Sequence, residues 1–151
     1  MRYGYDEFDE RQFKIRGEVY KHGWIFTVAL LLVNFFVTDF LGYEWARAPH
    51  MFFLCALVSI GFFAVEAIVR DVFTGRQAWR AEVIPAIELI AAGSMFVAAF
   101  RKYFGGGVLF AEGGMLTRNG VALATAAVFA AVGIVALAKL ARGRREARGQ
   151  E

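Results

Sequence analysis

The sequence contains few residues that can form covalent links or bind metals: one cysteine and two histidines in 151 residues. The single cysteine, Cys55, excludes an intrachain disulfide and a thiolate-rich metal site. HExxH, CxxC and Walker patterns are also absent, and no Ser–His–Asp or Cys–His set is available. These absences predict a chain that is not an enzyme and that carries no metal and no cofactor.

Charged residues are nearly missing from four long stretches, and the segments between these stretches hold almost all of the charge. Hydrophobic types make up 58% of the chain and charged types 21%, against roughly 45–50% and about 25% in ordinary globular proteins. A soluble domain spreads its charge along every surface element, so this segregation predicts helices that cross a bilayer. A bilayer core of about 30 Å needs roughly 20 helical residues, and each stretch reaches that length with its flanks.

The predicted fold class is all-α: an integral membrane antiparallel four-helix bundle preceded by a cytoplasmic amphipathic helix. The amphipathic helix is expected over residues 1–21, the bundle over 22–140 and a basic cytoplasmic tail over 141–151. Within the bundle, the helices are expected at about 23–41, 51–70, 82–101 and 120–140. Pro85 would then lie in the first turn of the third helix, where its missing N–H costs little.

Two connecting segments have alternative interpretations. Ala46-Arg47-Ala48 has the form of a signal-peptide cleavage site, but the region before the first span is long and acidic, so a retained span is predicted. The segment 105–120 contains six glycines. Because it lacks the strand-to-helix context of a phosphate-binding loop, we expect a flexible or shallowly re-entrant loop.

The distribution of lysine and arginine predicts the orientation of the spans. If both termini are cytoplasmic, the inner segments hold thirteen of these residues and the outer segments four. The sequence therefore predicts a multi-pass protein of the cytoplasmic membrane with both termini inside. The basic tail is then a membrane anchor, and the lipid bilayer, not nucleic acid, is the expected partner. His22 and His50 would lie at opposite membrane faces, so they could not share a metal ion.

The first segment has the charge order of a stable helix, with acids before bases and Glu10 and Lys14 in a favourable i,i+4 pair. Its apolar residues form two clusters on different faces, which favours packing against protein over flotation in lipid. The candidate partner-contact residues are Phe8, Phe13, Ile15 and Val19. The partner would be a second copy of the chain or another membrane or cytoplasmic protein.

Ionisable and polar residues inside the spans are the candidate site. A charged side chain at the centre of a membrane helix costs about 2.5–3.5 kcal/mol, so such residues mark functional sites by default. The candidates are Glu66, Glu88, Asn34, Ser59 and Arg70. A short loop joins the second and third helices, so Glu66 and Glu88 are expected at similar depth on neighbouring helices.

Two interpretations of these acids stay open. In one, Glu66 and Glu88 together bind a proton, a cation or a cationic substrate. In the other, both are structural: Glu66 pairs with Arg70 on its own helix, and Glu88 pairs with a loop base such as Arg80 or accepts backbone hydrogen bonds.

The segment Asp6-Glu7-Phe8-Asp9-Glu10-Arg11-Gln12, followed by Ile15-Arg16-Gly17 and an apolar helix, resembles the start of a group of small bacterial membrane proteins of uncharacterised function. These proteins have an acidic DERQ-type amphipathic segment before about four membrane helices. The resemblance implies a bacterial cytoplasmic membrane and carries over no active residues.

The leading functional hypothesis is a non-enzymatic accessory or regulatory subunit that binds a partner. The alternative is a small proton- or cation-coupled transporter using Glu66 and Glu88. The chain is similar to four-helix multidrug exporters in size and helix number, but its acids lie in the second and third helices and none lies in the first.

Overall fold

The computed structural model describes residues 10–73 and 78–148. Over these residues the chain is helical apart from one short hairpin and the connecting segments, so the predicted all-α class is confirmed. The elements are α1 (Glu10–Phe35), a π-helical turn η1 (Phe36–Phe40), α2 (Ala48–Val69), α3 (Ala78–Gly106), β1 (Ala111–Glu112), β2 (Met115–Leu116) and α4 (Arg118–Arg148). Four helical segments are long and apolar enough to cross a membrane: Glu10–Phe40, Ala48–Val69, Val83–Gly106 and Arg118–Glu146.

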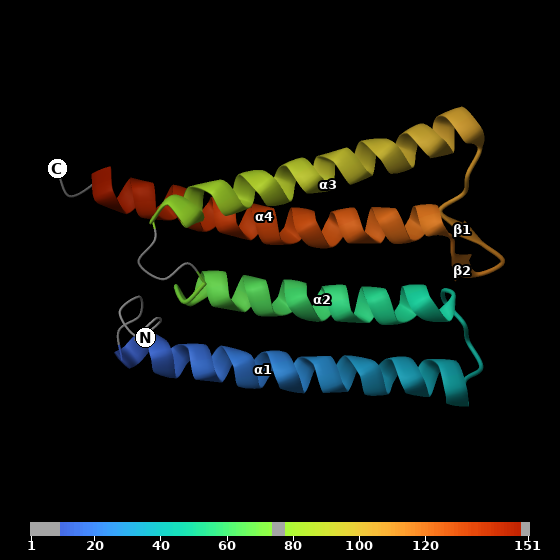
Figure 1. Cartoon of the computed structure of the whole chain (residues 1–151), viewed down its shortest axis with the longest axis horizontal. Coiled ribbons are helices and arrows are strands. Elements are labelled where there is room, and N and C mark those ends of the chain that lie inside the picture. Colours follow the sequence, from blue (N-terminus) through green and yellow to red (C-terminus); the bar gives the residue numbers. More distant parts are fainter. Residues whose placement is uncertain (1–9, 74–77, 149–151) are drawn as a thin grey trace, which may run out of the picture.

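The helices pack in the order α1, α2, α4, α3 (Figure 1). The sequence predicted α2 and α3 as neighbours because a short loop joins them, but α4 lies between them. Small residues explain this arrangement, because they let helix backbones approach closely. At Gly61 of α2 a Cβ atom would lie 2.7 Å from Val128 of α4, and at Gly133 of α4 it would lie 2.8 Å from Leu89 of α3.

One continuous helix, α1, occupies the region where the sequence predicted an amphipathic helix followed by a separate span. No proline interrupts it, and its Gly23 lies where α1 approaches α2: a Cβ atom there would be 3.3 Å from the ring of Phe63. The helix ends in the π-helical turn η1, closed by a hydrogen bond from Leu41 N–H to the Phe36 carbonyl. The amphipathic segment is therefore the first part of the first candidate span.

The last two helices also extend beyond their predicted limits. Because α3 begins at Ala78, Pro85 lies inside the helix and not in its first turn. A proline there removes one backbone hydrogen bond. Most of the expected basic tail is helical, since α4 continues to Arg148.

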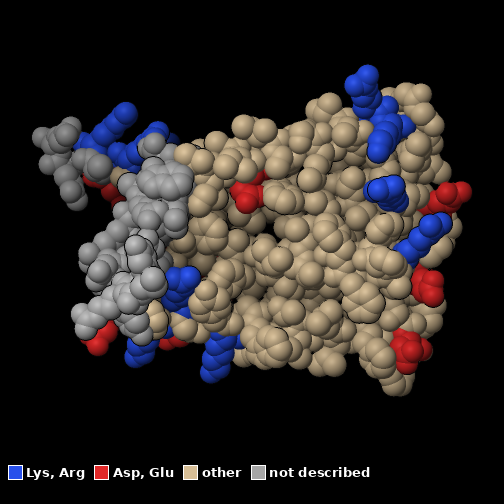
Figure 2. Space-filling view, viewed as in Figure 1, with Lys and Arg blue, Asp and Glu red and all other residues tan. Residues whose placement is uncertain are grey.

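The row of helices has two distinct ends. We call the end with the start of α1 and the finish of α4 the terminal end, and the end with β1 and β2 the hairpin end (Figure 1). On the face shown in Figure 2, charged side chains gather at these ends. The surface between them is uncharged except for one small acidic area. Many large apolar side chains of the helices are exposed. Apolar surface of this kind marks a site of contact with a membrane or with another protein.

The glycine-rich segment forms a hairpin, whereas the sequence predicted a flexible or re-entrant loop. Gly113 and Gly114 form the two-residue turn with φ values of 59° and 83°, which glycine adopts without steric penalty. Leu116 N–H donates to the Trp45 carbonyl at 2.7 Å, which ties the hairpin to the α1–α2 connection. Backbone pairing therefore orders this segment.

Candidate functional site

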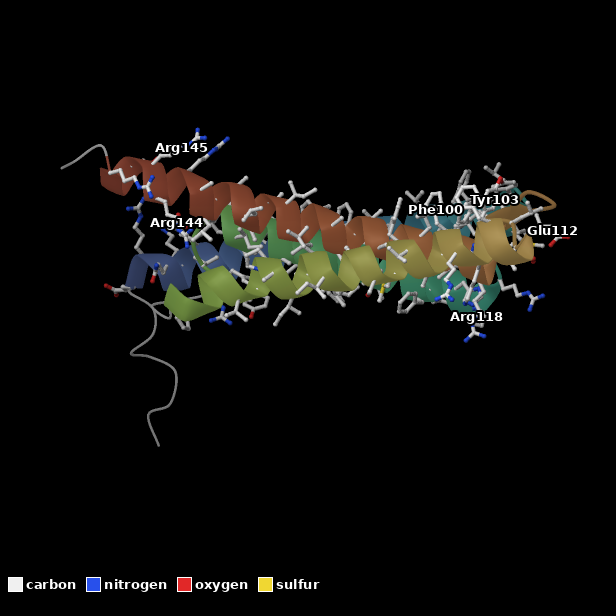
Figure 3. All side chains as sticks on the ribbon, turned by 90° about the horizontal axis from the view of Figure 1, so that it is seen from above. Phe100, Tyr103, Glu112, Arg118, Arg144 and Arg145 are labelled. Atoms are coloured by element: carbon white, nitrogen blue, oxygen red, sulfur yellow. The ribbon has the colours of Figure 1, made fainter. Side chains whose placement is uncertain are left out.

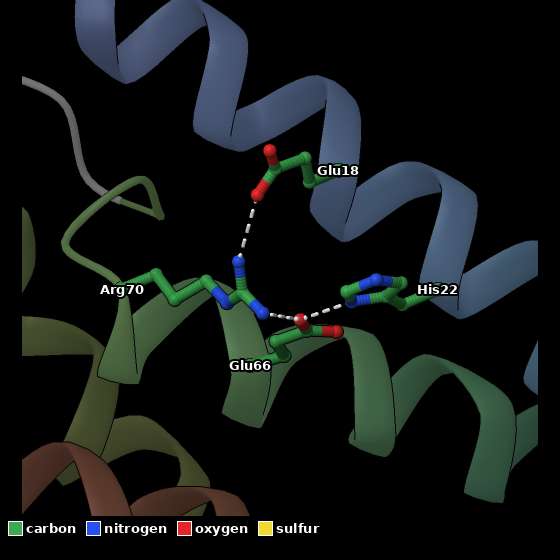
Figure 4. A network of polar contacts seen from close by, with 4 residues as sticks. All are labelled: Glu18, His22, Glu66 and Arg70. Carbon is green, nitrogen blue, oxygen red and sulfur yellow. Dashed lines mark hydrogen bonds and ion pairs between the residues drawn. The ribbon is translucent and has the colours of Figure 1, made fainter.

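Four ionisable side chains meet between α1 and α2 near the terminal end (Figure 4). Arg70 lies between two acids: its guanidinium is 2.9 Å from Glu66 Oε1 and 3.1 Å from Glu18 Oε2. His22 Nδ1 lies 2.7 Å from the same Glu66 oxygen. We call Glu18, His22, Glu66 and Arg70 the interhelical network.

Helical periodicity builds this network from two i,i+4 pairs. Glu18 and His22 are one turn apart on α1, and Glu66 of α2 is one turn before Arg70, the residue that caps the end of α2. Two facing helix surfaces therefore present all four groups. The adjoining apolar contact holds the helices in register: Val19 is 0% exposed and packs with Ala67 and Val72.

Glu66 is the most enclosed member of the network, since its side chain is 14% exposed while the other three lie between 36% and 51%. Its Oε1 atom has both partners, whereas its Oε2 atom is buried without a hydrogen bond among the described residues. A buried carboxylate needs a compensating charge, which Arg70 supplies. The pair of Glu66 with Arg70 is the one that the structural interpretation expected. The contacts with Glu18 and His22, which it did not expect, join α1 to α2.

Glu88 is separate from this network. It is half-buried on α3, beside Gly133 of α4, and α4 lies between it and α2. Glu66 and Glu88 therefore do not face each other across neighbouring helices. Among the described residues, Glu88 makes no ion pair and no hydrogen bond, and the side chain of Arg80 lies outside the described part of the chain.

The other polar candidates form local hydrogen bonds. Asn34 is buried and its Oδ1 accepts a 2.9 Å hydrogen bond from the Trp45 indole N–H. Ser59 is buried and its hydroxyl donates to the Cys55 carbonyl one turn earlier, at 2.8 Å. The side-chain carbonyl oxygen of Asn34 and the Ser59 hydroxyl thus have hydrogen-bond partners within the chain. Neither group forms a hydrogen bond with Glu66 or Glu88.

The four candidate partner-contact residues have different environments. Phe8 lies outside the described residues. Val19 is buried and Ile15 packs against its cluster, so the chain's own α2 covers this face. Phe13 is exposed. The reason is that α1 continues into the first span and packs along α2, so Ile15 and Val19 pack internally while Phe13 remains exposed.

Sequence reasoning missed Glu18 and His22, and also a second ion pair at the same end. Lys139 of α4 binds Asp71 at 2.8 Å and donates to the Val69 carbonyl at 3.0 Å, so it caps the end of α2. The i,i+4 spacing of Glu18 and His22 was a usable signal. The pairing of Lys139 with Asp71 had none, because it depends on α4 lying beside α2.

Among the side chains that the structure describes, no group of three or more His, Cys, Asp or Glu is placed to hold a metal ion. The fold places the protein among all-α chains with four helices that are long and apolar enough to cross a membrane. Comparison with models of known families, with curated proteins and with solved structures finds no match.

Proposed function

We propose that this chain is a multi-pass protein of the cell membrane, with both termini in the cytoplasm, that acts as a non-enzymatic accessory subunit by binding a membrane-embedded partner. The four candidate spans and the excess of basic residues in the terminal-end segments support the membrane placement. The partner is a second copy of the chain or another membrane protein.

The observation that carries this proposal is Glu88. It lies within the candidate span Val83–Gly106 and has no polar partner among the described residues. A carboxyl group in a membrane span ordinarily faces a protein interior or pairs with another group. Among the described residues, α4 is the helix against which α3 mainly packs, so the face of α3 directed away from α4 is open to another protein. A partner that supplies a base or a hydrogen-bond donor to Glu88 would satisfy this group.

The geometry favours this function over the transporter. Two acids that share one ion must approach each other, and here α4 separates Glu66 from Glu88. Glu66 is also already paired with Arg70. A transport mechanism that relies on both acids at one site therefore has no support from their positions.

In-membrane cross-linking tests the proposal. A photoreactive amino acid replaces Ile84, which lies one turn before Glu88 and is half-buried like it; the matched probe replaces Ile90, which is exposed on another face of α3. We expect a discrete adduct from position 84, strongly reduced by Glu88→Ala and retained by Glu112→Gln at the hairpin end. The absence of an adduct at position 84, or an adduct indifferent to Glu88→Ala, would contradict partner binding through Glu88.

The transporter alternative predicts a different result. Proteoliposomes containing the wild-type chain would carry a cation or proton flux that is lost in both Glu66→Gln and Glu88→Gln. The accessory-subunit proposal predicts no such flux.

A further inference from the structure

The hairpin-end half of α3 carries a groove that none of the preceding functions uses. Its volume is about 670 Å³, and it is open to the surroundings. Two parallel i,i+4 rows line it: Gly93, Val97 and Arg101 form one row, and Ser94, Ala98 and Lys102 form the other. The buried residues Ala92 and Ala99 lie on the opposite face of α3, against α4, so the groove faces outward.

The groove changes from apolar to cationic along its length. Its first part has small or apolar walls: Gly93 has open space where a Cβ would be, and the Ser94 hydroxyl is already bonded to the Ala91 carbonyl at 2.8 Å. Arg101 and Lys102, both exposed, close the other end. Within the described residues, neither cation forms an ion pair.

We infer that this groove binds an anionic glycerophospholipid, with the phosphate on Arg101 and Lys102 and an acyl chain along Val97, Ala98 and Gly93. The inference does not depend on the proposed partner or on which side of the membrane the hairpin end faces. Basic side chains beside membrane helices bind anionic head groups, and long basic side chains extend toward the membrane surface.

The dimensions fit one lipid leaflet. The helix rises about 1.5 Å per residue, so the nine steps from Gly93 to Lys102 span roughly 13 Å. Half of a hydrocarbon core of about 30 Å is roughly 15 Å. A lipid with its phosphate level with Lys102 would therefore have its chain end near the depth of Gly93.

Charge favours a lipid over a second copy of the chain in this groove. Two copies related by a two-fold axis along the membrane normal would bring both Arg101–Lys102 pairs to the same depth. Like charges in a medium of low dielectric constant repel strongly, whereas an anionic head group compensates them.

Native mass spectrometry of the full chain in a neutral detergent tests this inference. The probe is phosphatidylglycerol, with phosphatidylcholine of the same acyl chains as the zwitterionic comparison. We expect tighter binding of phosphatidylglycerol and a loss of about 30-fold in the Arg101→Gln/Lys102→Gln variant, since each cation near an anionic lipid surface contributes a factor of about five. Exchanging the two cations, as Arg101→Lys/Lys102→Arg, should retain binding.

Two further variants distinguish specific lipid binding in the groove from nonspecific electrostatic attraction. Arg47→Gln/Arg142→Gln removes the same net charge from exposed positions outside the groove and should leave binding unchanged. Gly93→Leu keeps both cations but fills the apolar part, and should lower the affinity for phosphatidylglycerol without unfolding the chain, since a Cβ there meets no atom within 4 Å.

Several results would overturn the inference. These are equal binding of the two lipids, an equal loss in Arg47→Gln/Arg142→Gln, or displacement of the lipid by glycerol phosphate, which lacks acyl chains. A dimer that disappears in Gly93→Leu would assign the groove to a second copy and would also overturn it.

Discussion

The two ends of the helix row satisfy their polar groups in different ways. At the terminal end, side chains from different helices pair with one another: Arg70 joins two acids, and Lys139 binds Asp71. At the hairpin end, side chains bond to backbone: Asn119 donates to the Ala99 and Val108 carbonyls, and Thr117 donates to the Leu109 carbonyl. The cations there have no acidic partner among the described residues.

This difference has a consequence for what each end can bind. At the terminal end, ion pairs hold α1, α2 and α4 together. The hairpin end is held by backbone geometry and by stacked rings such as Tyr103 and Phe110, whose centroids are 5.0 Å apart. Figure 3 shows Phe100, Tyr103, Glu112 and Arg118 at this end and Arg144 and Arg145 at the other. The basic groups of the hairpin end therefore remain available to an anionic ligand.

The largest effect should come from the backbone contacts of the hairpin end. A Cβ at Gly120 would collide with the Phe110 carbonyl oxygen, so Gly120→Ala should lower the free energy of unfolding by about 3 kcal/mol or more. The matched control is Gly17→Ala in α1, which meets no atom within 4 Å and should be neutral or stabilising by up to about 1 kcal/mol. Thermal unfolding in detergent measures both, and equal stability of the two variants would refute the packing described for the hairpin.

The next effect tests the interhelical network. Arg70→Met leaves the Glu66 carboxylate, 14% exposed, without its cation and should destabilise the chain by about 2 kcal/mol. Glu18→Gln removes a half-exposed carboxylate from the same arginine and should cost under about 1 kcal/mol. Denaturant titration in detergent gives both values. A larger loss in Glu18→Gln than in Arg70→Met would mean that Glu66 is not the centre of the network.

A smaller loss is expected where a side-chain hydrogen bond joins α1 to the loop after it. Trp45→Phe keeps the aromatic packing but leaves the buried Asn34 Oδ1 without its donor, which should cost about 1–2 kcal/mol. The double variant Trp45→Phe/Asn34→Leu should recover part of this loss, because no buried polar atom then lacks a partner. If the losses of stability caused by Trp45→Phe and Asn34→Leu were fully additive, this would argue against the hydrogen bond between these side chains.

The smallest effect should be at the surface ion pair of the terminal end. Lys139→Gln breaks a pair whose two side chains are 40% and 68% exposed, so it should cost under about 1 kcal/mol. Its contribution should also fall as salt is raised, since exposed charges are screened over about 10 Å at 0.1 M. The loss caused by Gly120→Ala should not change with salt, and this contrast is read from unfolding in low and high salt.

The sequence predicted where the helices lie along the chain better than it predicted which helices pack against each other. Segregated charge and apolar length were sufficient for the four spans, because these properties belong to each segment alone. The order of packing depends on where helix faces allow a close approach: α2 approaches α4 at Gly61, and α4 approaches α3 at Gly133. No segment considered alone carries that information. For this reason the sequence wrongly predicted Glu66 and Glu88 on neighbouring helices, whereas α4 lies between α2 and α3.

The candidate site was predicted in part for the same reason. The Glu66–Arg70 pair lies within one helix, so its spacing revealed it. Glu18 and His22 belong to another helix, and their role depends on α1 remaining continuous past residue 21. The hairpin was missed because a segment with six glycines predicts flexibility, whereas Gly113 and Gly114 supply the positive φ values of a tight turn.

Labelling of single cysteines from either side of a sealed membrane tests the four-span arrangement most directly. In a Cys55→Ala background, Glu112→Cys marks the hairpin end and Gly143→Cys the terminal end. The account predicts that a membrane-impermeant maleimide labels position 112 in intact cells and position 143 only in inverted vesicles. Labelling of both positions from the same side of the membrane would contradict it.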